Sequence, residues 1–413
     1  MSIHIAIFED EHFNRLYPLS LTRPVYDLRC GISLLREKIE RCFENTNIHY
    51  FCRNYLAEVF RENFDETNQS IQISNVGDGD YLLINGRFIF GDGEIQKIAA
   101  KSSQECVWKK NEGIIAARIT GKQLASIIDQ HDGVIPASTF DGLPKSDQEI
   151  AGDFIRYPWD LVNANAKQIG KDFKSFNRGG KIAGEIYPNV TLLNEGNIYI
   201  AAGAKIKPGV VLDAEEGPIF INENATIMPN AVLEGPAFIG KNSQVKIGAK
   251  IYEGTSIGEV CKVGGEVEES IIHSYSNKQH DGFLGHAYLG QWVNIGADSN
   301  NSDLKNNYGN VKVFINGEWI DSGSQFVGLF MGDHSKCAIN TMFNTGTVVG
   351  VMCNVFGAGF PPKHISSFSW GGAENIEPYK IEKALEVARQ VMPRRNKILS
   401  LAQEKMLISI FHK

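Results

Sequence analysis

Residues 221–263 read INENATIMPNAVLEGPAFIGKNSQVKIGAKIYEGTSIGEVCKV and carry an aliphatic side chain at every sixth position. These positions are Ile221, Ile227, Leu233, Ile239, Val245, Ile251, Ile257 and Val263. A small residue precedes each of the last seven by two positions. A helix repeats every 3.6 residues and a strand every two, so neither alone produces a step of six. Six residues form one extended face and one corner, which predicts a three-sided coil with one aliphatic side chain inward per face.

The six-residue step returns on both sides of this stretch. The other members are Ile200, Ile206 and Leu212 before it, and Phe283, Leu289, Ile295, Met331, Cys337, Phe343, Val349 and Val355 after it. Stacked coils bury a continuous aliphatic column, so several repeats are needed for stability. We expect glycines such as Gly240, Gly258 and Gly264 at the corners, where a left-handed backbone is accessible without a Cβ. An irregular β-sandwich is the alternative.

This pattern resembles the hexapeptide repeat of the left-handed parallel β-helix, a superfamily of acyl- and nucleotidyltransferases. The resemblance implies the handedness of the coil and a homotrimer. It also implies active sites in the clefts between neighbouring prisms. Segments that leave the repeat, at residues 274–283 and 298–313, are expected to carry function.

The first part of the chain alternates strands and helices instead. Strands are predicted at His4–Phe8, Ile48–Cys52 and Tyr81–Asn85, with helices at Gly31–Phe43 and Pro158–Phe173. This order favours a Rossmann-like α/β domain whose parallel sheet binds ligands at the carboxyl ends of its strands. We expect an α/β nucleotidyltransferase-like domain at 1–176, a left-handed parallel β-helix at 185–372 and C-terminal helices at 376–413. Pro393 is predicted to begin the last helix.

The composition narrows the class of protein. The 413 residues carry a net charge of −7 and no basic run, which argues against a nucleic-acid partner. Seven cysteines without a CxxC motif fit a reducing cytoplasm and argue against a zinc site. The acidic residues 9–11 do not suit a signal peptide, and no apolar stretch suits a membrane span. We therefore expect a cytoplasmic protein.

Residues 15–24, RLYPLSLTRP, resemble the signature loop of sugar-1-phosphate nucleotidyltransferases. Such a loop offers backbone N–H groups to phosphates, and an arginine neutralises charge that develops on the α-phosphate. The resemblance implies that Arg15 is catalytic and that Arg23 and Arg29 are auxiliary cations in substrate binding. For Arg23 and Arg29, surface or interdomain salt bridges are the alternative.

Two further segments resemble the same family. Residues 81–87 end in Asn85-Gly86-Arg87 where the family has Asn-Gly-Asp, and Pro158-Trp159-Asp160-Leu161 resembles its closing segment. The resemblance implies that Asn85, Gly86 and Asp160 contact substrate. Arg87 stands where the family's magnesium-binding aspartate would be, so the metal ligand is left open. Either Glu9 or Asp10 holds Mg²⁺, or the domain binds without reacting.

Residues 278–285 and 293–297 resemble the acetyltransferase half of GlmU-type glucosamine-1-phosphate acetyltransferase/uridylyltransferases. The resemblance assigns His280 as the general base, a role that suits a pKa near working pH. An exposed loop histidine is the alternative. The resemblance also assigns Asn294 to binding of the sugar and Ala297 to binding of acetyl-CoA. The resemblance implies further substrate contacts from Lys278, Lys305, Asn307 and Tyr308.

Together the resemblances imply a sugar-phosphate transferase that makes a nucleotide sugar such as UDP-N-acetylglucosamine. It would join nucleotidyl transfer onto a sugar-1-phosphate to acetyl transfer from acetyl-CoA onto an amino-sugar phosphate. Its small-molecule partners would be a nucleoside triphosphate, the sugar-1-phosphate and acetyl-CoA. Mg²⁺ is expected if the nucleotidyltransferase half is active. The alternatives are an enzyme with one active half and a non-catalytic trimeric scaffold that binds a nucleotide sugar.

Overall fold

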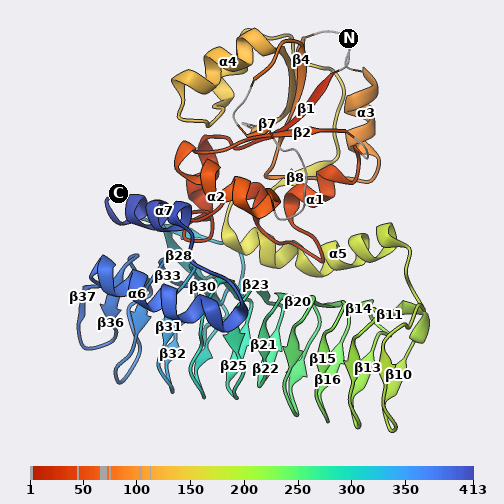
Figure 1. Ribbon diagram of the computed structural model, residues 1–413, viewed down its shortest axis with the longest axis vertical. Helices are drawn as coiled ribbons and strands as arrows, with labels where there is room; N and C mark the ends of the chain where they lie inside the picture. The colour runs from red at the N-terminus through yellow and green to blue at the C-terminus, as the bar shows by residue number, and fades with distance from the viewer. Residues whose placement is uncertain (1–2, 44–45, 66–71, 74–75, 102–104, 112) are drawn as a thin grey trace.

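The computed structural model describes residues 3–43, 46–65, 72–73, 76–101, 105–111 and 113–413 (Figure 1). An α/β domain lies against one side of a long β-helix, and helix α5 (Pro158–Phe176) runs along the junction between them (Figure 1). None of the described helices is long and apolar enough to cross a membrane.

The first domain contains a six-stranded sheet in the order β3-β2-β1-β4-β7-β6. Its strands are β1 (His4–Phe8), β2 (Ile48–Phe51), β3 (Gln72–Ile73), β4 (Asp80–Asn85), β6 (Cys106–Lys110) and β7 (Gly113–Thr120). The predicted parallel pairing is confirmed for β1 to β4, whereas β7 is antiparallel to both of its neighbours. The connection from Lys110 to Gly113 is too short for a parallel crossover, so β6 and β7 form a hairpin.

The helices of this domain are α1 (Leu35–Glu40), α2 (Asn54–Asp65), α3 (Glu94–Lys101), α4 (Gly121–Gln130) and α5. A separate antiparallel pair, β5 (Phe88–Phe90) and β8 (Gly152–Phe154), lies beyond the end of β4. This pair positions the residues between β8 and α5 beside the carboxyl end of the main sheet.

The second domain is a three-sided parallel β-helix, as the repeat predicts, and of the left-handed type that the resemblance implies. One sheet contains β10 (Thr191–Leu193), β13 (Val211–Asp213), β16 (Val232–Glu234), β19 (Lys250–Ile251), β22 (Glu266–Glu268) and β25 (Phe283–Gly285). The second contains β11 (Ile198–Ile200), β14 (Ile219–Ile221), β17 (Ala237–Ile239), β20 (Thr255–Glu259), β23 (Ile271–Ser274), β26 (Tyr288–Gln291), β30 (Leu329–Met331), β33 (Thr347–Val349) and β35 (His364–Ile365).

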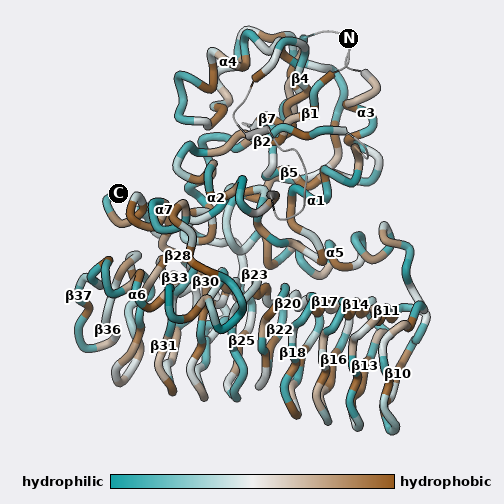
Figure 2. Tube along the Cα trace, viewed as in Figure 1, coloured by the Kyte–Doolittle hydropathy of each residue, from teal (hydrophilic) through white to brown (hydrophobic). Residues whose placement is uncertain are grey.

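The third side contains β9 (Glu185–Ile186), β12 (Lys205–Ile206), β15 (Thr226–Ile227), β18 (Gln244–Val245), β21 (Lys262–Val263) and β24 (Asn277–Lys278). It continues through a bridge at Asn294 to β31 (Lys336–Cys337), β34 (Asn354–Val355), β36 (Ser369–Gly371) and β37 (Ile376–Pro378). Hydrophobic stretches recur on every coil (Figure 2). The eight aliphatic side chains of residues 221–263 are each at most 1% exposed and form one core, which confirms the predicted inward column.

The corners differ from the prediction. Gly240 and Gly258 do not have a left-handed backbone, whereas Asn224, Asn230 and Asn242 do, with φ of 56°, 61° and 57°. Asparagine tolerates this conformation because its short side chain hydrogen-bonds locally. Gly264 lacks a left-handed backbone as well. Gly240 and Gly258 are required by close stacking instead, since a Cβ on Gly258 would lie 1.7 Å from the carbonyl oxygen of His273 on the next coil.

The hexapeptide register shifts beyond Val263. Val267 pairs with Leu284, so Leu284 rather than Phe283 occupies the inward position. Val263 pairs with Lys278, which places a lysine in the aliphatic column of the third side. Lys278 is 1% exposed, and its ammonium group donates to the carbonyl oxygens of His280 at 2.6 Å and Asp281 at 3.2 Å.

The excursion after Asp298 packs against the first domain. It contains β27 (Asn300–Asn301), which pairs with β32 (Met342–Phe343), and the hairpin β28 (Lys312–Ile315) with β29 (Glu318–Asp321). Val313 and Ile315 belong to the same buried cluster as Leu16 of the first domain. The Asn316 side chain donates to the Asn14 carbonyl oxygen at 2.9 Å. This excursion therefore builds the interdomain contact.

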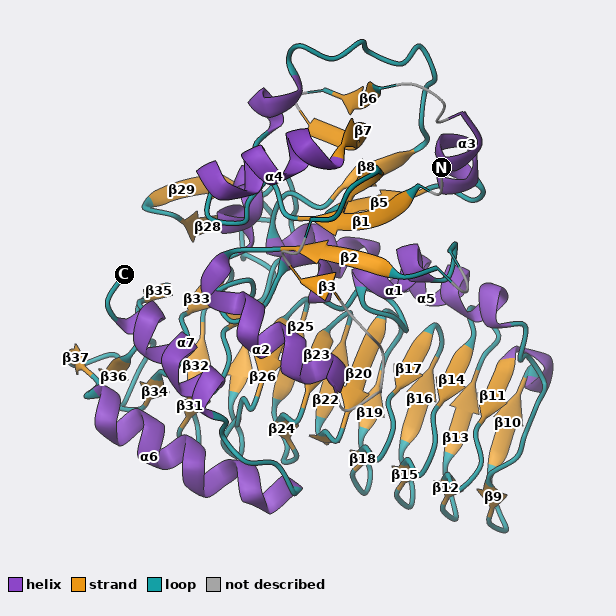
Figure 3. Ribbon diagram, turned by 45° about the horizontal axis from the view of Figure 1, so that its top comes forward, coloured by secondary structure: helices purple, strands orange, loops and turns teal. Residues whose placement is uncertain are grey.

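The C-terminal segment begins with α6 (Ile381–Val391), as predicted. Pro393 then lies inside a short 3₁₀ turn (Met392–Arg395), and the last helix, α7 (Leu401–Phe411), begins only after Ser400 caps it. The predicted helix start at Pro393 is therefore wrong. Helix α7 lies beside α2 (Figure 3), and Ser400 donates to the Glu62 carboxylate at 2.6 Å.

Buried charges join the two domains. Arg23 donates to Asp333 and also lies 2.9 Å from Nε2 of His273, and its ion pair with Asp333 is 6% exposed on both sides. Arg29 donates to both carboxylate oxygens of Glu259, at 2.8 and 3.0 Å. Burial, together with Arg23 and Arg29, holds the pKa of His273 well below its usual value. The neutral imidazole can therefore lie between two guanidinium groups.

We predict that Arg23→Ala destabilises the protein by about 3–5 kcal/mol, because Asp333 would remain buried without its partner. Urea unfolding measures the change. In the Arg23→Ala/Asp333→Ala double variant the loss should be smaller than the sum of the two single losses. Additive losses would show that the ion pair does not couple the domains.

A second charged cluster lies on the β-helix. His286 Nδ1 is 2.9 Å from Asp303, and Nε2 is 3.3 Å from Glu269. Burial opposes the charged imidazole, but the hydrogen bonds to Asp303 and Glu269 outweigh it and raise the pKa of His286 to about 9. The folded protein therefore binds a proton that the unfolded chain, with a histidine pKa of about 6.5, releases.

Because the folded pKa of His286 is raised, its contribution is complete below about pH 6.5 and is lost as the pH rises through 9. We expect a loss of about 2–3 kcal/mol between pH 6.5 and 9.5, measured by urea unfolding. His286→Asn should flatten the profile over this range. An unchanged profile in that variant would contradict the assignment.

Candidate functional site

A cationic pocket of about 400 Å³ lies at the carboxyl ends of β1 and β4. The chain leaves β1 through a 3₁₀ turn (Glu11–Leu16), and the Asp10 side chain caps this turn by accepting from the His12 N–H at 3.2 Å. The lining residues are His12, Arg15, Arg87, Lys110, Asn111, Gly113, Phe154, Arg156 and Tyr157. This set contains four cationic side chains and no carboxylate. A pocket with this charge suits the phosphate groups of a nucleotide.

The floor of the pocket is a buried ion pair. Arg87 contacts Asp10 through two hydrogen bonds of 2.5 and 2.8 Å, and Asn85 donates to the same carboxylate at 2.8 Å. Burial opposes the charge on Asp10, but Arg87 outweighs it and lowers the pKa of the carboxyl. Asp10 and Arg87 thus neutralise each other.

The carboxylates proposed for magnesium do not fit a metal. Glu9 accepts from the Arg53 side chain at 2.9 and 3.1 Å and from the Val25 N–H at 2.8 Å. Both Glu9 and Asp10 are thus occupied by guanidinium groups. Across the described ranges, no group of three or more His, Cys, Asp or Glu residues is arranged to hold a metal ion. The Glu9-or-Asp10 hypothesis for Mg²⁺ is therefore not supported by this donor set.

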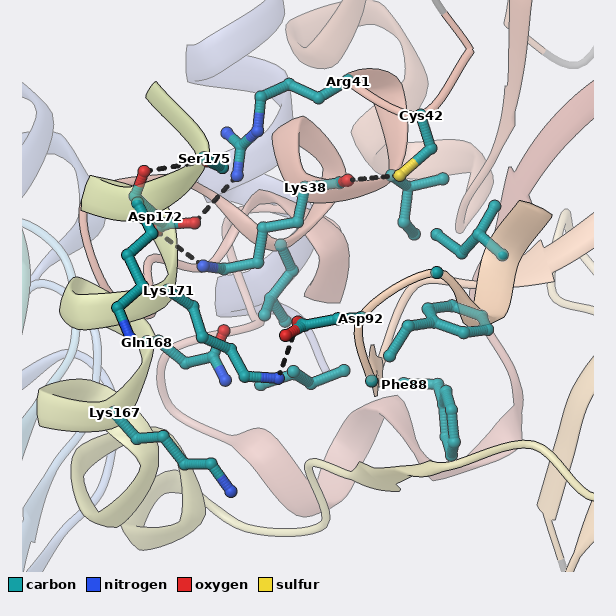
Figure 4. A pocket seen from close by; sticks show the side chains of 18 of the residues that line it. Lys38, Arg41, Cys42, Phe88, Asp92, Lys167, Gln168, Lys171, Asp172 and Ser175 are labelled. Atoms are coloured by element: carbon teal, nitrogen blue, oxygen red, sulfur yellow. Dashed lines mark hydrogen bonds and ion pairs between the residues drawn. The ribbon is translucent and has the colours of Figure 1, made fainter. Parts of the chain in front are cut away.

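The pocket continues as a groove toward α5. The adjoining cavity has a volume of about 450 Å³ and shares Lys110 and Arg156 with the first. It leads through Lys167 and Lys171 into the largest cavity, about 830 Å³, between α1, α3 and α5 (Figure 4). We call the whole feature the cationic groove and define it by its five cations, Arg15, Lys110, Arg156, Lys167 and Lys171.

The charges along the groove are unequally compensated. In the largest cavity Lys38 and Arg41 both pair with Asp172, and Lys171 pairs with Asp92 (Figure 4). Lys110 donates to the Gly152 carbonyl oxygen and pairs with Asp153, a carboxylate that is 90% exposed, so this ion pair is weak. Arg15 and Arg156 form no ion pair within the described part of the chain. The first pocket, which contains Arg15 and Arg156, therefore has more uncompensated positive charge for binding an anion than the cavity between α1, α3 and α5.

The structure places the predicted residues of the first domain in three kinds of position. Arg15 lines the pocket. Asn85 and Gly86 lie beneath it, and a Cβ on Gly86 would lie 2.5 Å from Tyr26, so this glycine is required by packing. Asp160 lines the adjoining cavity and caps α5 by accepting from the N–H groups of Arg156 and Tyr157.

The substrate-binding prediction for Arg23 and Arg29 is corrected. Both guanidinium groups are buried at the domain interface in the ion pairs described above. The interdomain salt bridge considered for these residues is the arrangement observed.

The predicted residues of the second domain do not form one site within the chain. His280 lies exposed at a corner after β24, and Asn294 lines a different cavity on the third side. Lys305, Asn307 and Tyr308 lie on a loop at residues 305–310, with Tyr308 66% exposed. Ala297 lies at the corner after Ile295, where its carbonyl accepts from Asn340. For Lys278 the substrate-binding prediction is corrected, because its ammonium group points into the coil.

Sequence reasoning missed most of the pocket. Lys110 lies at the end of β6, and Arg156 and Tyr157 precede α5, far from the signature loop in sequence. In this region the sequence marked only the segment Pro158-Trp159-Asp160-Leu161 at the start of α5. Single lysines and arginines outside a motif carry no signal that they converge.

Comparisons with known proteins agree with this geometry. Residues 5–181 match the family model described as sugar nucleotidyl transferase. A bifunctional sugar-1-phosphate nucleotidylyltransferase/acetyltransferase from Sulfurisphaera tokodaii is 31% identical over 205 residues, which cover 49% of this chain and 44% of that protein. A bifunctional protein GlmU from Methanococcus aeolicus is 28% identical over 232 residues, covering 55% of this chain and 45% of that protein.

Among solved structures, the UDP-N-acetylglucosamine acyltransferase from Campylobacter jejuni aligns over 54% of this chain and 95% of that chain. Its sequence identity is 12% and its TM-score 0.24, a likeness too distant to bear on function. The alignments span less than half the length of the curated relatives.

The first domain is thus of the sugar nucleotidyl transferase class. Over about half of its length the chain is also similar to the two bifunctional relatives named above.

We predict that Lys110→Gln weakens binding of a nucleoside triphosphate about tenfold or more, because a charge-assisted hydrogen bond contributes about 1.5–3 kcal/mol. Arg15→Gln should have a similar effect. Lys109→Gln is the matched control, since Lys109 is adjacent on β6 but pairs with Asp141 outside the pocket. Calorimetric titration with UTP and dTTP measures the affinities. Equal weakening by Lys109→Gln would contradict a specific pocket.

Proposed function

We propose that the protein is a two-domain sugar-phosphate transferase. Its first domain transfers a nucleotidyl group onto a sugar-1-phosphate, and its second transfers an acetyl group from acetyl-CoA onto an amino-sugar phosphate. The observation that carries the proposal is the pocket after β1, where Arg15, Lys110 and Arg156 converge without a lining carboxylate. The names of the relatives support the pairing of the two activities.

In the nucleotidyl transfer, an oxygen of the sugar-1-phosphate attacks the α-phosphorus of the nucleoside triphosphate. The bond from that phosphorus to the bridging oxygen breaks, and pyrophosphate leaves with the electron pair. Arg15 and Arg156 stabilise the negative charge that accumulates on the phosphoryl oxygens. Phe154 and Tyr157 provide apolar surface beside them for a base or sugar ring. The groove toward Lys167 has room for the second substrate.

In the acetyl transfer, the amine of the sugar attacks the thioester carbonyl. The carbon–sulfur bond breaks, the thiolate leaves, and the amine loses a proton. His280 accepts that proton and returns one to the thiolate, so that free CoA is released. The exposure of His280 makes it accessible to a substrate. His280 lines none of the pockets described above, so a homotrimer would supply the missing wall, with Asn294, Ala297 and the 305–308 loop as further contacts.

The product would be a nucleotide sugar of the UDP-N-acetylglucosamine type. The seven cysteines form no disulfide, which fits a reducing compartment and supports the predicted cytoplasmic location.

One observation favours a second candidate function for the first domain. Glu9 and Asp10 are both occupied by arginines, which suits a domain that binds a nucleotide sugar without reacting.

Two assays test the proposal. Thiol release is followed with acetyl-CoA and glucosamine-1-phosphate, and pyrophosphate release with UTP or dTTP and a sugar-1-phosphate, with and without Mg²⁺. We expect His280→Ala to lower thiol release at least a hundredfold, as for loss of a general base. His412→Ala, at the exposed C-terminus, should leave both rates unchanged.

The two assays separate the alternatives. Thiol release unaffected by His280→Ala would overturn the acetyl-transfer assignment. No pyrophosphate with any nucleotide and metal, together with measurable nucleotide binding, would leave the first domain as a binding module.

A further inference from the structure

A second cationic pocket lies beneath the C-terminal segment. It has a volume of about 350 Å³ and is lined by Lys262, Tyr275, Asn277, Gln279, Trp292, Val293, Asn294, Lys336, Val391, Arg394 and Arg395. Its inner wall is the third side of the β-helix, and its outer wall is the end of α6 with the 3₁₀ turn that follows. Four lining side chains are cationic and none is acidic.

The inner wall is a ladder of outward-facing polar side chains. Lys262 pairs with Asn277, Asn277 bridges to Asn294, and Asn294 bridges to Lys336, so these four side chains stack on successive coils. The Asn277 amide donates to Asn294 at 3.4 Å. The parallel stacking of the coils thus places one ammonium group, from Lys262 or Lys336, at each end of a row that has two amides in the middle.

The outer wall is rigid. Met392 is 2% exposed and anchors the turn, which closes with hydrogen bonds from Asn396 to Pro393 and from Lys397 to Met392. Arg395 reaches across the pocket and donates to Asn277 at 3.0 Å. Arg395 is therefore held facing the ladder, and the exposed Arg394 lines the same pocket.

The four cations have no acidic partner. Within the described part of the chain, Lys262, Lys336, Arg394 and Arg395 form no ion pair with a carboxylate. Burial lowers the pKa of Lys262, and Arg395, Lys246 and Arg394 lower it further. Burial also lowers the pKa of Lys336 to about 8. Mutual repulsion of this kind is relieved by a bound anion.

An aromatic pair completes the pocket. Tyr275 stacks on Trp292 with ring centroids 4.6 Å apart and an interplanar angle of 18°. The indole of Trp292 stacks in turn against His334, at 6.1 Å. The pair offers an apolar edge next to the cations, a combination suited to a ring that carries a phosphate.

We propose that this pocket binds the phosphate group of a small phosphorylated molecule, with Arg394, Arg395 and Lys262 on the phosphate oxygens and the Tyr275–Trp292 pair beside the attached ring. An amino-sugar phosphate and the diphosphate of CoA share this chemistry. The binding site stands on its own geometry, and only the identity of the ligand rests on the proposed acetyl transfer. Arg394 and Arg395 act as binding residues supplied by the C-terminal segment.

Calorimetric titration and tryptophan fluorescence test the site, with pyrophosphate, glucosamine-1-phosphate and CoA as probes. Arg395→Gln and Lys262→Gln should each weaken the bound probe about tenfold or more. Lys205→Gln is the matched control, because Lys205 occupies the same ladder position three coils earlier, outside the pocket. Thermal unfolding checks that each variant is folded. If Arg395→Gln does not fold, Arg394→Gln replaces it in the test, because the Arg394 side chain is exposed.

The outcomes are distinct. Binding of glucosamine-1-phosphate that is lost in Arg395→Gln and kept in Lys205→Gln identifies a sugar-phosphate site, and the same result with CoA identifies a donor site. Absence of binding by all three probes would overturn the proposal, as would equal weakening by Lys205→Gln. Binding that survives in a protein without thiol release would refute the acetyl transfer and leave the pocket intact.

Discussion

Inward burial of one aliphatic side chain per face is the constraint on which the second domain depends. Each coil closes only if its three inward side chains meet those of the coils above and below, so the backbone must advance by a fixed step. The step in turn places the outward-facing residues of successive coils in straight ladders. Lys262, Asn277, Asn294 and Lys336 form such a ladder without being neighbours in sequence. The apolar column thereby organises a polar surface.

The same column also governs how the domains meet. The second sheet presents a flat side on which α5 lies, with Ile169 and Phe173 packed against Tyr199, Phe220 and Phe238. Around this apolar contact the buried arginines Arg23 and Arg29 are satisfied by acids of the β-helix. A buried charge without a partner is strongly destabilising, so these pairs fix the relative position of the domains. The loop that follows β1 and carries Arg15 is therefore fixed at its Arg23 end by the ion pair with Asp333.

At the carboxyl ends of the first sheet, electrostatics rather than shape distinguishes this chain from the pattern it resembles. Arg87 and Arg53 neutralise the two carboxylates at the end of β1, whereas Arg15 and Arg156 line the groove and form no ion pair among the residues that the structure describes. Guanidinium and ammonium groups would then supply the positive charge that a phosphate substrate requires. The cationic groove and the second cationic pocket are two separate cationic surfaces, one on each domain.

The sequence alone determined the β-helix, because a period of six can be satisfied only by a repeated corner and a common interior. It also indicated the α/β domain and the loop that carries Arg15. It could not determine that Lys278 turns inward, because the register shift after Val263 depends on coil stacking. Nor could it show that Arg23 and Arg29 face the other domain, or that Lys110, Arg156 and Arg395 line pockets. Those positions follow from packing between segments far apart in the chain, and local periodicity carries no information about which distant surfaces will meet.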